Sequence, residues 1–155
     1  MSAAERLAEI GLTLPPVPRP AGVYVPALRH GNLVYTSGQL PLVDGNLTAT
    51  GKVGDSAGAV DPADANVAAR TCVLNALAAA AEAAGGLDNI ERVVKVTGFV
   101  ASEPSFTGQP GVINGASQLL GEIFGAVGAH ARSAVGVAVL PMDAPVEVEI
   151  VVAVR

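Results

Sequence analysis

The 155-residue chain has no tryptophan, a single cysteine, two histidines and only 3% aromatic residues. One cysteine, Cys72, cannot form an internal disulfide, and we expect it to be a buried core residue. His30 and His130 lie far apart in the sequence and read as loop residues, so no Cys/His cluster has the spacing of a metal site. Few aromatic rings also leave few platforms for stacking nucleic-acid bases.

Basic residues are scarce as well. The chain has nine Lys and Arg residues and fourteen Asp and Glu residues, which gives a net charge of -5. It contains no run of basic residues that could neutralise a series of phosphates. The N-terminus lacks the cationic and apolar segments of a signal peptide. The longest apolar tract, residues 73–84, is too short for a bilayer of about 30 Å. We therefore expect a soluble cytoplasmic protein with neither a nucleic-acid nor a membrane partner.

Small apolar residues dominate what is present. Half of the chain is hydrophobic and 15% is charged, which excludes intrinsic disorder. A chain of this length buries roughly two-thirds of its unfolded surface and can form one core without cross-links. We divide it into an N-terminal helix and proline-rich arm, residues 1–21, and a single domain, residues 22–155. The arm contains Pro15, Pro16, Pro18 and Pro20.

Turn residues predict two hairpins in the first third of the domain. Strands over 23–28 and 33–37 flank a turn at 29–32, and Asp44-Gly45-Asn46 separates shorter strands at 40–43 and 47–50. Glycine and asparagine tolerate the positive φ that such turns require.

The long helix expected over 62–84 has clear ends. Asp61 is a good N-cap, Pro62 suits the first helical position, and Gly85 ends the helix. We predict one buried stripe along it, formed by Val67, Thr71, Leu74, Ala78 and Ala81. A strand over 90–101 and a helix over 112–124 follow.

The C-terminal third predicts two strands with distinct faces. Residues 133–140 alternate valines with the small Ala134, Gly136 and Ala138. Residues 146–154 place valines and an isoleucine on one face, with Glu147 and Glu149 on the other. The order of elements indicates an α+β fold with two helices on one face of a sheet. An uncovered Val-rich face favours a homo-oligomer.

Arg132 is the candidate binding residue in this pattern. It opens an apolar strand on the same side as small residues, where a guanidinium could bind a carboxylate bidentately. The alternative is an arginine at a strand edge that is paired with Glu147 or Glu149.

Several segments together resemble the Rid (reactive intermediate deaminase) family, also called the YjgF-like or L-PSP endoribonuclease family. The resemblance covers residues 22–155 in the right order. Its most specific parts are the G-N-x-x-x-x-S-G-Q segment at 31–39 and the R-S-x-V segment at 132–135 with L-P at 140–141 and V-E-V-E at 146–149.

That resemblance implies a chorismate-mutase-like fold, a homotrimer, and a site in each cleft between subunits. The family's deaminases hydrolyse reactive 2-imino acids to 2-keto acids and ammonia without a metal or cofactor. Carried over, Arg132 binds the substrate carboxylate and Glu147 holds the attacking water. The positions that line the cleft are Tyr24, Ser37, Gly38, Asn114 and Ala134, the last through its backbone.

Departures from the family pattern place the chain in a divergent subgroup. Ser117 stands where the deaminases often have an aromatic residue, Ala134 where they often have cysteine, and the loop over 103–113 is longer than usual. The expected activity is deamination of small 2-imino acids. Two alternatives stay open: a non-catalytic trimeric binder of small carboxylates, and a ribonuclease or translation inhibitor, which the acidic charge disfavours.

Overall fold

The structure is a computed structural model that describes residues 1–17, 19–20 and 22–155. Pro18 of the predicted arm lies outside the described residues. The elements run in the order α1 (Ala3–Glu9), β1 (Ala27–His30), β2 (Leu33–Thr36), β3 (Leu42–Val43), β4 (Asn46–Leu47), α2 (Pro62–Ala84), β5 (Ile90–Ala101), α3 (Gln109–Phe124), β6 (Ala131–Val137) and β7 (Val146–Val154).

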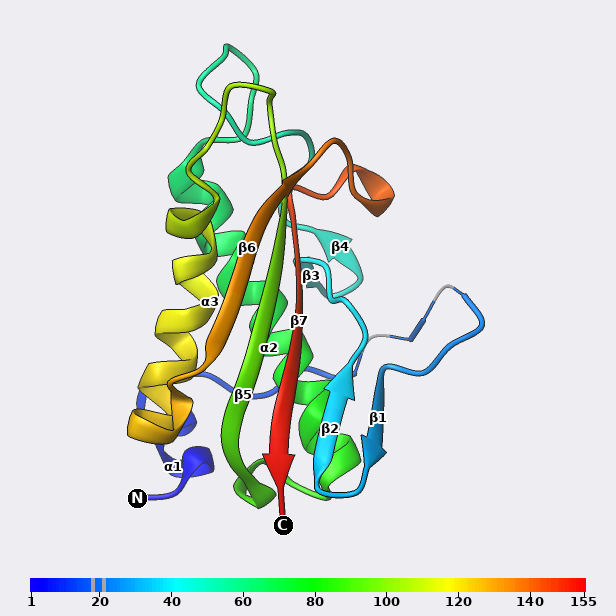
Figure 1. Ribbon diagram of the computed structural model, residues 1–155, viewed down its shortest axis with the longest axis vertical. Coiled ribbons are helices and arrows are strands. Elements are labelled where there is room, and N and C mark those ends of the chain that lie inside the picture. Colours follow the sequence, from blue (N-terminus) through cyan, green and yellow to red (C-terminus); the bar gives the residue numbers. More distant parts are fainter. Residues whose placement is uncertain (18, 21) are drawn as a thin grey trace.

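A five-stranded mixed sheet forms one layer of the molecule, with the strand order β1-β2-β7-β5-β6. Only β5 and β6 run parallel, and the other neighbours are antiparallel. The long helices α2 and α3 lie together on one side of this sheet (Figure 1). The α+β class with two helices on one face is therefore confirmed, and β3 and β4 form a separate small hairpin.

The last strand, β7, shows the predicted alternation. Val146, Val148 and Ile150 are at most 1% exposed beneath the helices, whereas Glu147 and Glu149 alternate with them and are only half-buried on the opposite face. Because strand side chains alternate between faces, this one segment fixes which side of the sheet is core.

Helix α2 has the predicted ends but a different buried face. Asp61 caps it through the backbone N–H of Ala63, and Gly85 ends it in the left-handed conformation. Val67, predicted to be buried, is 62% exposed, so the predicted stripe is wrong in its first turns. The buried residues begin with Ala65, Ala68, Ala69, Cys72 and Val73. Alanine on almost every side leaves little periodicity, so the packing of α2 against the sheet and α3 selects the face.

The contact between the two long helices depends on one glycine. A Cβ on Gly115 of α3 would lie within 3.0 Å of the backbone carbonyl group of Asn66 in α2. The two helix backbones can approach this closely only because the side chain is absent.

Cys72, which lies within α2, is buried, and this confirms the core role predicted for it.

Other boundaries differ modestly from the predictions. Strand β1 begins at Ala27 rather than at 23 and continues to His30, so Gly31-Asn32 alone forms the turn. Strand β6 covers Ala131–Val137 instead of 133–140, and α3 begins at Gln109 rather than at 112. Backbone pairing with β5 sets the limits of β6, because Lys95 to Ala101 pair with Ala131 to Val137.

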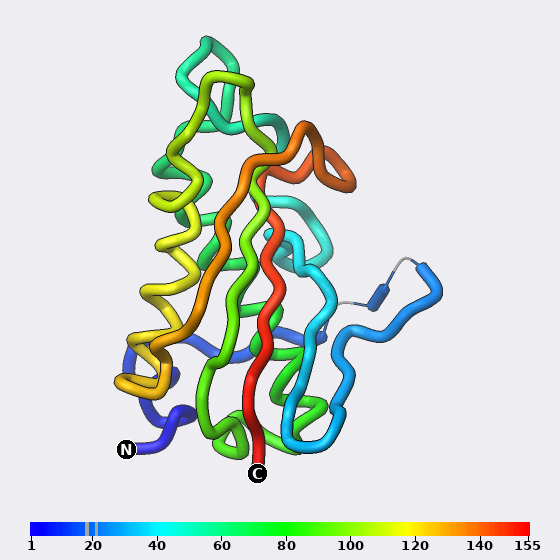
Figure 2. Tube along the Cα trace, viewed as in Figure 1, coloured from blue at the N-terminus to red at the C-terminus, as the bar shows by residue number. Residues whose placement is uncertain are grey.

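The N-terminal extension folds back onto the domain. Ser2 and Glu5 form a capping box at the start of α1, and Leu12 and Leu14 of the following arm pack against the core. Figure 2 shows the chain after α1, which lies beside α3, crossing toward the side of the molecule that holds β1 and β2.

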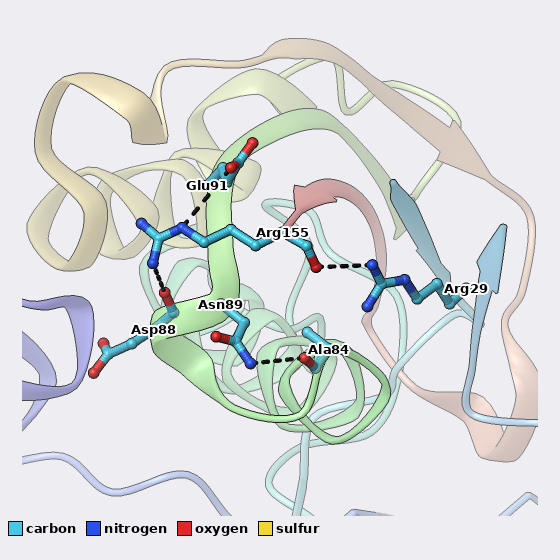
Figure 3. Close-up of polar contacts among 6 residues, drawn as sticks. All are labelled: Arg29, Ala84, Asp88, Asn89, Glu91 and Arg155. Carbon is cyan, nitrogen blue, oxygen red and sulfur yellow. Dashed lines mark hydrogen bonds and ion pairs between the residues drawn. The ribbon is translucent and has the colours of Figure 1, made fainter. Parts of the chain in front are cut away.

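The C-terminus is held by polar contacts at the same end of the molecule (Figure 3). The backbone carbonyl of Arg155 accepts a hydrogen bond from Nη2 of Arg29 at 2.8 Å. The guanidinium of Arg155 donates to the carbonyl of Asp88 at 3.2 Å. The exposed ion pair of Arg155 with Glu91, at 3.8 Å, adds little stability.

Helix α2 is also long and apolar enough to cross a membrane by length and composition. However, 67% of its most apolar window is buried inside this fold. Its apolar character is therefore accounted for by packing in the core of the domain.

Candidate functional site

Arg132 lies on edge strand β6 and points toward α3. It pairs in register with Val96, which is fully buried under the helices. Nη1 of Arg132 donates to Oδ1 of Asn114 at 2.8 Å and to Oγ of Ser117 at 3.2 Å, and Nη2 donates to the carbonyl of Pro110 at 3.3 Å. These three partners lie on one face of α3, because they are spaced by four and three residues.

The alternative role for Arg132, an ion pair with Glu147 or Glu149, is wrong. Those carboxylates project from the other face of the sheet, and Arg132 is held by neutral acceptors instead. A guanidinium has five N–H donors, and three are used here. Among the described residues, Nε–H and one Nη2–H remain without a protein partner. Nε and Nη2 are neighbouring nitrogens of the planar fork, as bidentate binding of a carboxylate requires.

Two residues that the sequence analysis did not assign to the site extend this cluster. Nε2 of His130 lies 2.9 Å from Oγ of Ser117, and Nδ1 of His130 lies 2.6 Å from the carbonyl oxygen of Gly128. The sequence predicts a loop position for His130, and the residue does lie between the elements, directly before β6. The available signal was its spacing, because His130 precedes Arg132 by two residues and therefore faces the same side.

The small residues on β6 do not leave the expected hollow at Arg132 itself: a cavity lined in part by Gly136 and Ala138 does not include the arginine. A Cβ on Gly136 would lie 2.7 Å from Nε2 of Gln109, and Ala134 packs against the core cluster. Their small size lets the first turn of α3 lie close to β6. The same helix that fills this space supplies the acceptors that hold Arg132.

A second cluster forms around Glu147 on the opposite face of the sheet. The backbone after β2 runs beside β7, where Gln39 and Val148 exchange two hydrogen bonds at 2.8 and 3.0 Å. This pairing stacks Gly38 on the Glu147 side chain. A Cβ on Gly38 would lie 2.7 Å from Cδ of Glu147 and closer still to Oε1, so position 38 must be glycine for the carboxylate to keep its place.

Burial raises the pKa of Glu147, and the nearby negative charge of Glu149 raises it further. Both carboxylates project from the same face of β7, two residues apart. A carboxyl group with a raised pKa can exchange a proton nearer to neutral pH than an ordinary glutamate. Glu147 therefore has the electrostatic setting of a general base.

The remaining two candidates are Ser37, which directly precedes Gly38, and Tyr24, which lies just before β1. Oγ of Ser37 donates to the carbonyl of Val25 at 2.6 Å, and its backbone N–H donates to Pro26 at 2.8 Å. These bonds fasten the chain before β1 to the end of β2. Tyr24, just ahead of Val25, is 56% exposed.

Within one protomer the two clusters are separate. Across the sheet, Glu147 pairs with Phe99 of β5, and Phe99 pairs with Val135 of β6. Glu147 is therefore two strands away from β6, at the level of a residue three positions after Arg132. Strand spacing of about 4.8 Å and a rise of about 3.3 Å per residue place the two Cα atoms well over 10 Å apart. The structure joins Asn114 to Arg132 by a hydrogen bond and separately places Gly38 against Glu147. Ala134 follows Arg132 by two residues on β6, and Ser37 directly precedes Gly38.

No three His, Cys, Asp or Glu side chains come together as a possible metal site within the described part of the chain. Arg132 and Glu147 themselves offer carboxylate binding by a guanidinium and proton transfer by a carboxyl group.

Comparisons with known proteins agree with the resemblance found in the sequence. The family model described as Endoribonuclease L-PSP matches residues 16–154. Protein TCP17 from Trypanosoma cruzi is 44% identical over 150 residues, which are 96% of this chain and 92% of that protein.

Solved structures extend the agreement to the fold. The crystal structure of Atu1372 from Agrobacterium tumefaciens, whose function is unknown, has a TM-score of 0.88 at 46% identity and covers 99% of this chain and 92% of that one. The structure of TdcF from E. coli, with bound serine, has a TM-score of 0.65 at 28% identity over 90% of this chain and 93% of that chain. The chain belongs to the endoribonuclease L-PSP family.

Proposed function

We propose that this protein hydrolyses small reactive 2-imino acids to 2-keto acids and ammonia in the cytoplasm. Arg132 binds the substrate carboxylate and Glu147 holds and deprotonates the attacking water. The observation that carries the proposal is the guanidinium of Arg132, which is held by three protein acceptors. Two of its adjacent nitrogens keep N–H donors that no other described residue accepts.

Hydrolysis of an imine requires few further groups from the protein. An imine carbon is already electrophilic, so the rate depends on holding the substrate and placing water within about 3 to 3.5 Å of that carbon. The raised pKa of Glu147 favours acceptance of a proton from water and its later transfer to the departing nitrogen. Neither step needs a cofactor.

A second copy of the chain completes this site in the proposal. Arg132 and Glu147 cannot reach one small molecule within a protomer, so we place the site in a cleft between subunits of a chorismate-mutase-like homotrimer. Exposed apolar side chains support association through the open face of the sheet. Leu28, Tyr35 and Val135 on that face are 59%, 43% and 44% exposed.

The surrounding residues take supporting roles in the proposed cleft. Tyr24, Ser37 and Gly38 line the side contributed with Glu147, and Asn114 and the backbone of Ala134 line the side contributed with Arg132. Residues 22–155 form the domain that contains this site, and residues 1–21 extend it.

A non-catalytic binder of small carboxylates is the second candidate function. It is favoured by the same free donors of Arg132, and by the serine bound in the related TdcF structure. The two candidates differ in whether Glu147 is needed, because binding requires only the arginine side of the cleft.

The test couples the protein to a threonine dehydratase in the presence of semicarbazide, which traps the released imine. Wild-type protein is expected to suppress trapping and speed formation of 2-oxobutyrate, and Arg132→Ala is expected to abolish both effects. Arg70→Ala is the matched control, because Arg70 pairs with Glu122 on the surface of the helical layer.

The outcomes separate the candidates. If wild type and Arg132→Ala suppress trapping equally, the deaminase proposal is wrong. If neither suppresses trapping, but calorimetry detects 2-oxobutyrate binding to wild type and not to Arg132→Ala, the binder is the correct function.

A further inference from the structure

We propose that Ser117 and His130 are positioning residues that hold Arg132 ready for a carboxylate. The inference rests on the proposed function and adds two residues to its site. The relevant feature is a chain of hydrogen bonds that runs from Arg132 through Ser117 to His130 and ends at the carbonyl of Gly128.

The direction of this chain follows from its last member. A carbonyl oxygen can only accept, so Nδ1 of His130, 2.6 Å from Gly128, carries the proton. In the neutral imidazole Nε2 is then an acceptor. The hydroxyl of Ser117, 2.9 Å away, donates to it.

This arrangement turns Ser117 into an acceptor for the arginine. With its single proton committed to His130, Oγ of Ser117 presents lone pairs to Nη1 of Arg132 at 3.2 Å. Asn114 accepts from the same nitrogen at 2.8 Å. Both N–H groups of Nη1 are therefore engaged, and the guanidinium cannot rotate without losing one of these bonds.

The consequence lies on the other edge of the guanidinium. Nη1 is fixed to Asn114 and Ser117, and one Nη2–H is fixed to Pro110. Within the described residues, the Nε–H and the second Nη2–H are the donors left for a carboxylate. An arginine that is already ordered loses less side-chain entropy when a carboxylate binds. Ser117 and His130 therefore act on affinity, through Arg132, and need not touch the reacting carbon.

Paired variants distinguish the hydroxyl from mere volume. Ser117→Ala removes the acceptor, whereas Ser117→Thr keeps a hydroxyl at the same place. His130→Leu removes the acceptor for Ser117, whereas His130→Gln offers an amide oxygen in place of Nε2.

Ser117→Ala and His130→Leu are expected to raise KM for the imine about five- to tenfold, as loss of one hydrogen bond predicts, with kcat within about twofold of wild type. Ser117→Thr and His130→Gln are expected to recover most of the affinity. The proposal is overturned if Ser117→Ala keeps the wild-type KM, if Ser117→Thr is as impaired as Ser117→Ala, or if kcat falls while KM is constant.

A second measurement does not depend on activity. Side-chain ¹⁵N NMR reports rotation of the Arg132 guanidinium, whose signals are assigned by their loss in Arg132→Lys. Slow rotation in wild type and faster rotation in Ser117→Ala support positioning even if no imine hydrolysis is found. Equal rotation rates in the two proteins overturn the positioning role of Ser117, whether or not the protein hydrolyses imines.

Discussion

Arg132 and Glu147 project from opposite faces of the same sheet, with strand β5 between their strands. Each has its own supporting structure: α3 holds the arginine through Asn114 and Ser117, and the backbone at Gly38 lies against the glutamate. A reaction that uses both groups must therefore take one from each of two subunits.

Mixing two inactive variants tests this division. Arg132→Ala and Glu147→Gln should each be inactive in the coupled assay. After denaturation and refolding together at equal concentration, random assembly restores both residues at about one quarter of inter-subunit sites, and activity should return to about that fraction of wild type. No recovery, in assemblies shown by mass spectrometry to be mixed, would place both residues in one subunit's site.

The pH dependence of activity should report the environment of Glu147. Its raised pKa means that protonation removes the base, and hence activity, at a higher pH than for an ordinary glutamate. Glu149→Gln removes the second cause of the shift, so the acid limb of the kcat profile should move to lower pH. A limb that stays in place would exclude Glu147 as the group responsible.

The raised pKa of Glu147 also makes the free energy of unfolding depend on pH. The folded state binds the Glu147 proton more tightly than the unfolded state, so the free energy of unfolding falls as pH rises from the ordinary pKa through the raised one. Glu147→Gln should remove this contribution and raise the unfolding midpoint in urea at pH 7 but not at pH 3. Equal effects at both pH values would contradict it.

Gly38→Ala should disturb the carboxylate directly. The added Cβ would collide with the Glu147 side chain, so we expect a large loss of kcat with binding of 2-oxobutyrate to the arginine side retained. Gly121→Ala is the matched control, because its Cβ meets nothing within 4 Å. As an exposed position within α3, it should gain up to about 1 kcal/mol of stability and keep full activity.

Cys72 should be unreactive in the native protein. It is completely buried in α2, and burial, together with the charge of Glu147, raises the pKa of its thiol well above the usual range. Thiolate is the reactive form, so modification by a thiol reagent should follow global unfolding. The rate measured across a urea series should track the unfolding equilibrium, and rapid labelling in native buffer would show local opening of α2.

Local signals determined much of this protein from sequence. The ends of α2 follow from Asp61, Pro62 and Gly85, because caps and left-handed glycine act within a few residues. The two faces of β7 follow from strict alternation of apolar and acidic residues. Arg132 and Glu147 are identifiable from their place in these patterns and in the family's motifs.

Tertiary structure decided what local patterns leave open. The buried face of the Ala-rich α2 is set by packing on the sheet and on Gly115, since small side chains permit several faces. The space beside Ala134 and Gly136 is occupied by α3, because only the fold brings Gln109 to that strand. The hydrogen bonds of Ser117 with His130 and with Arg132 likewise join α3 to the start of β6, so the role of Ser117 depends on how the helix packs against the strand.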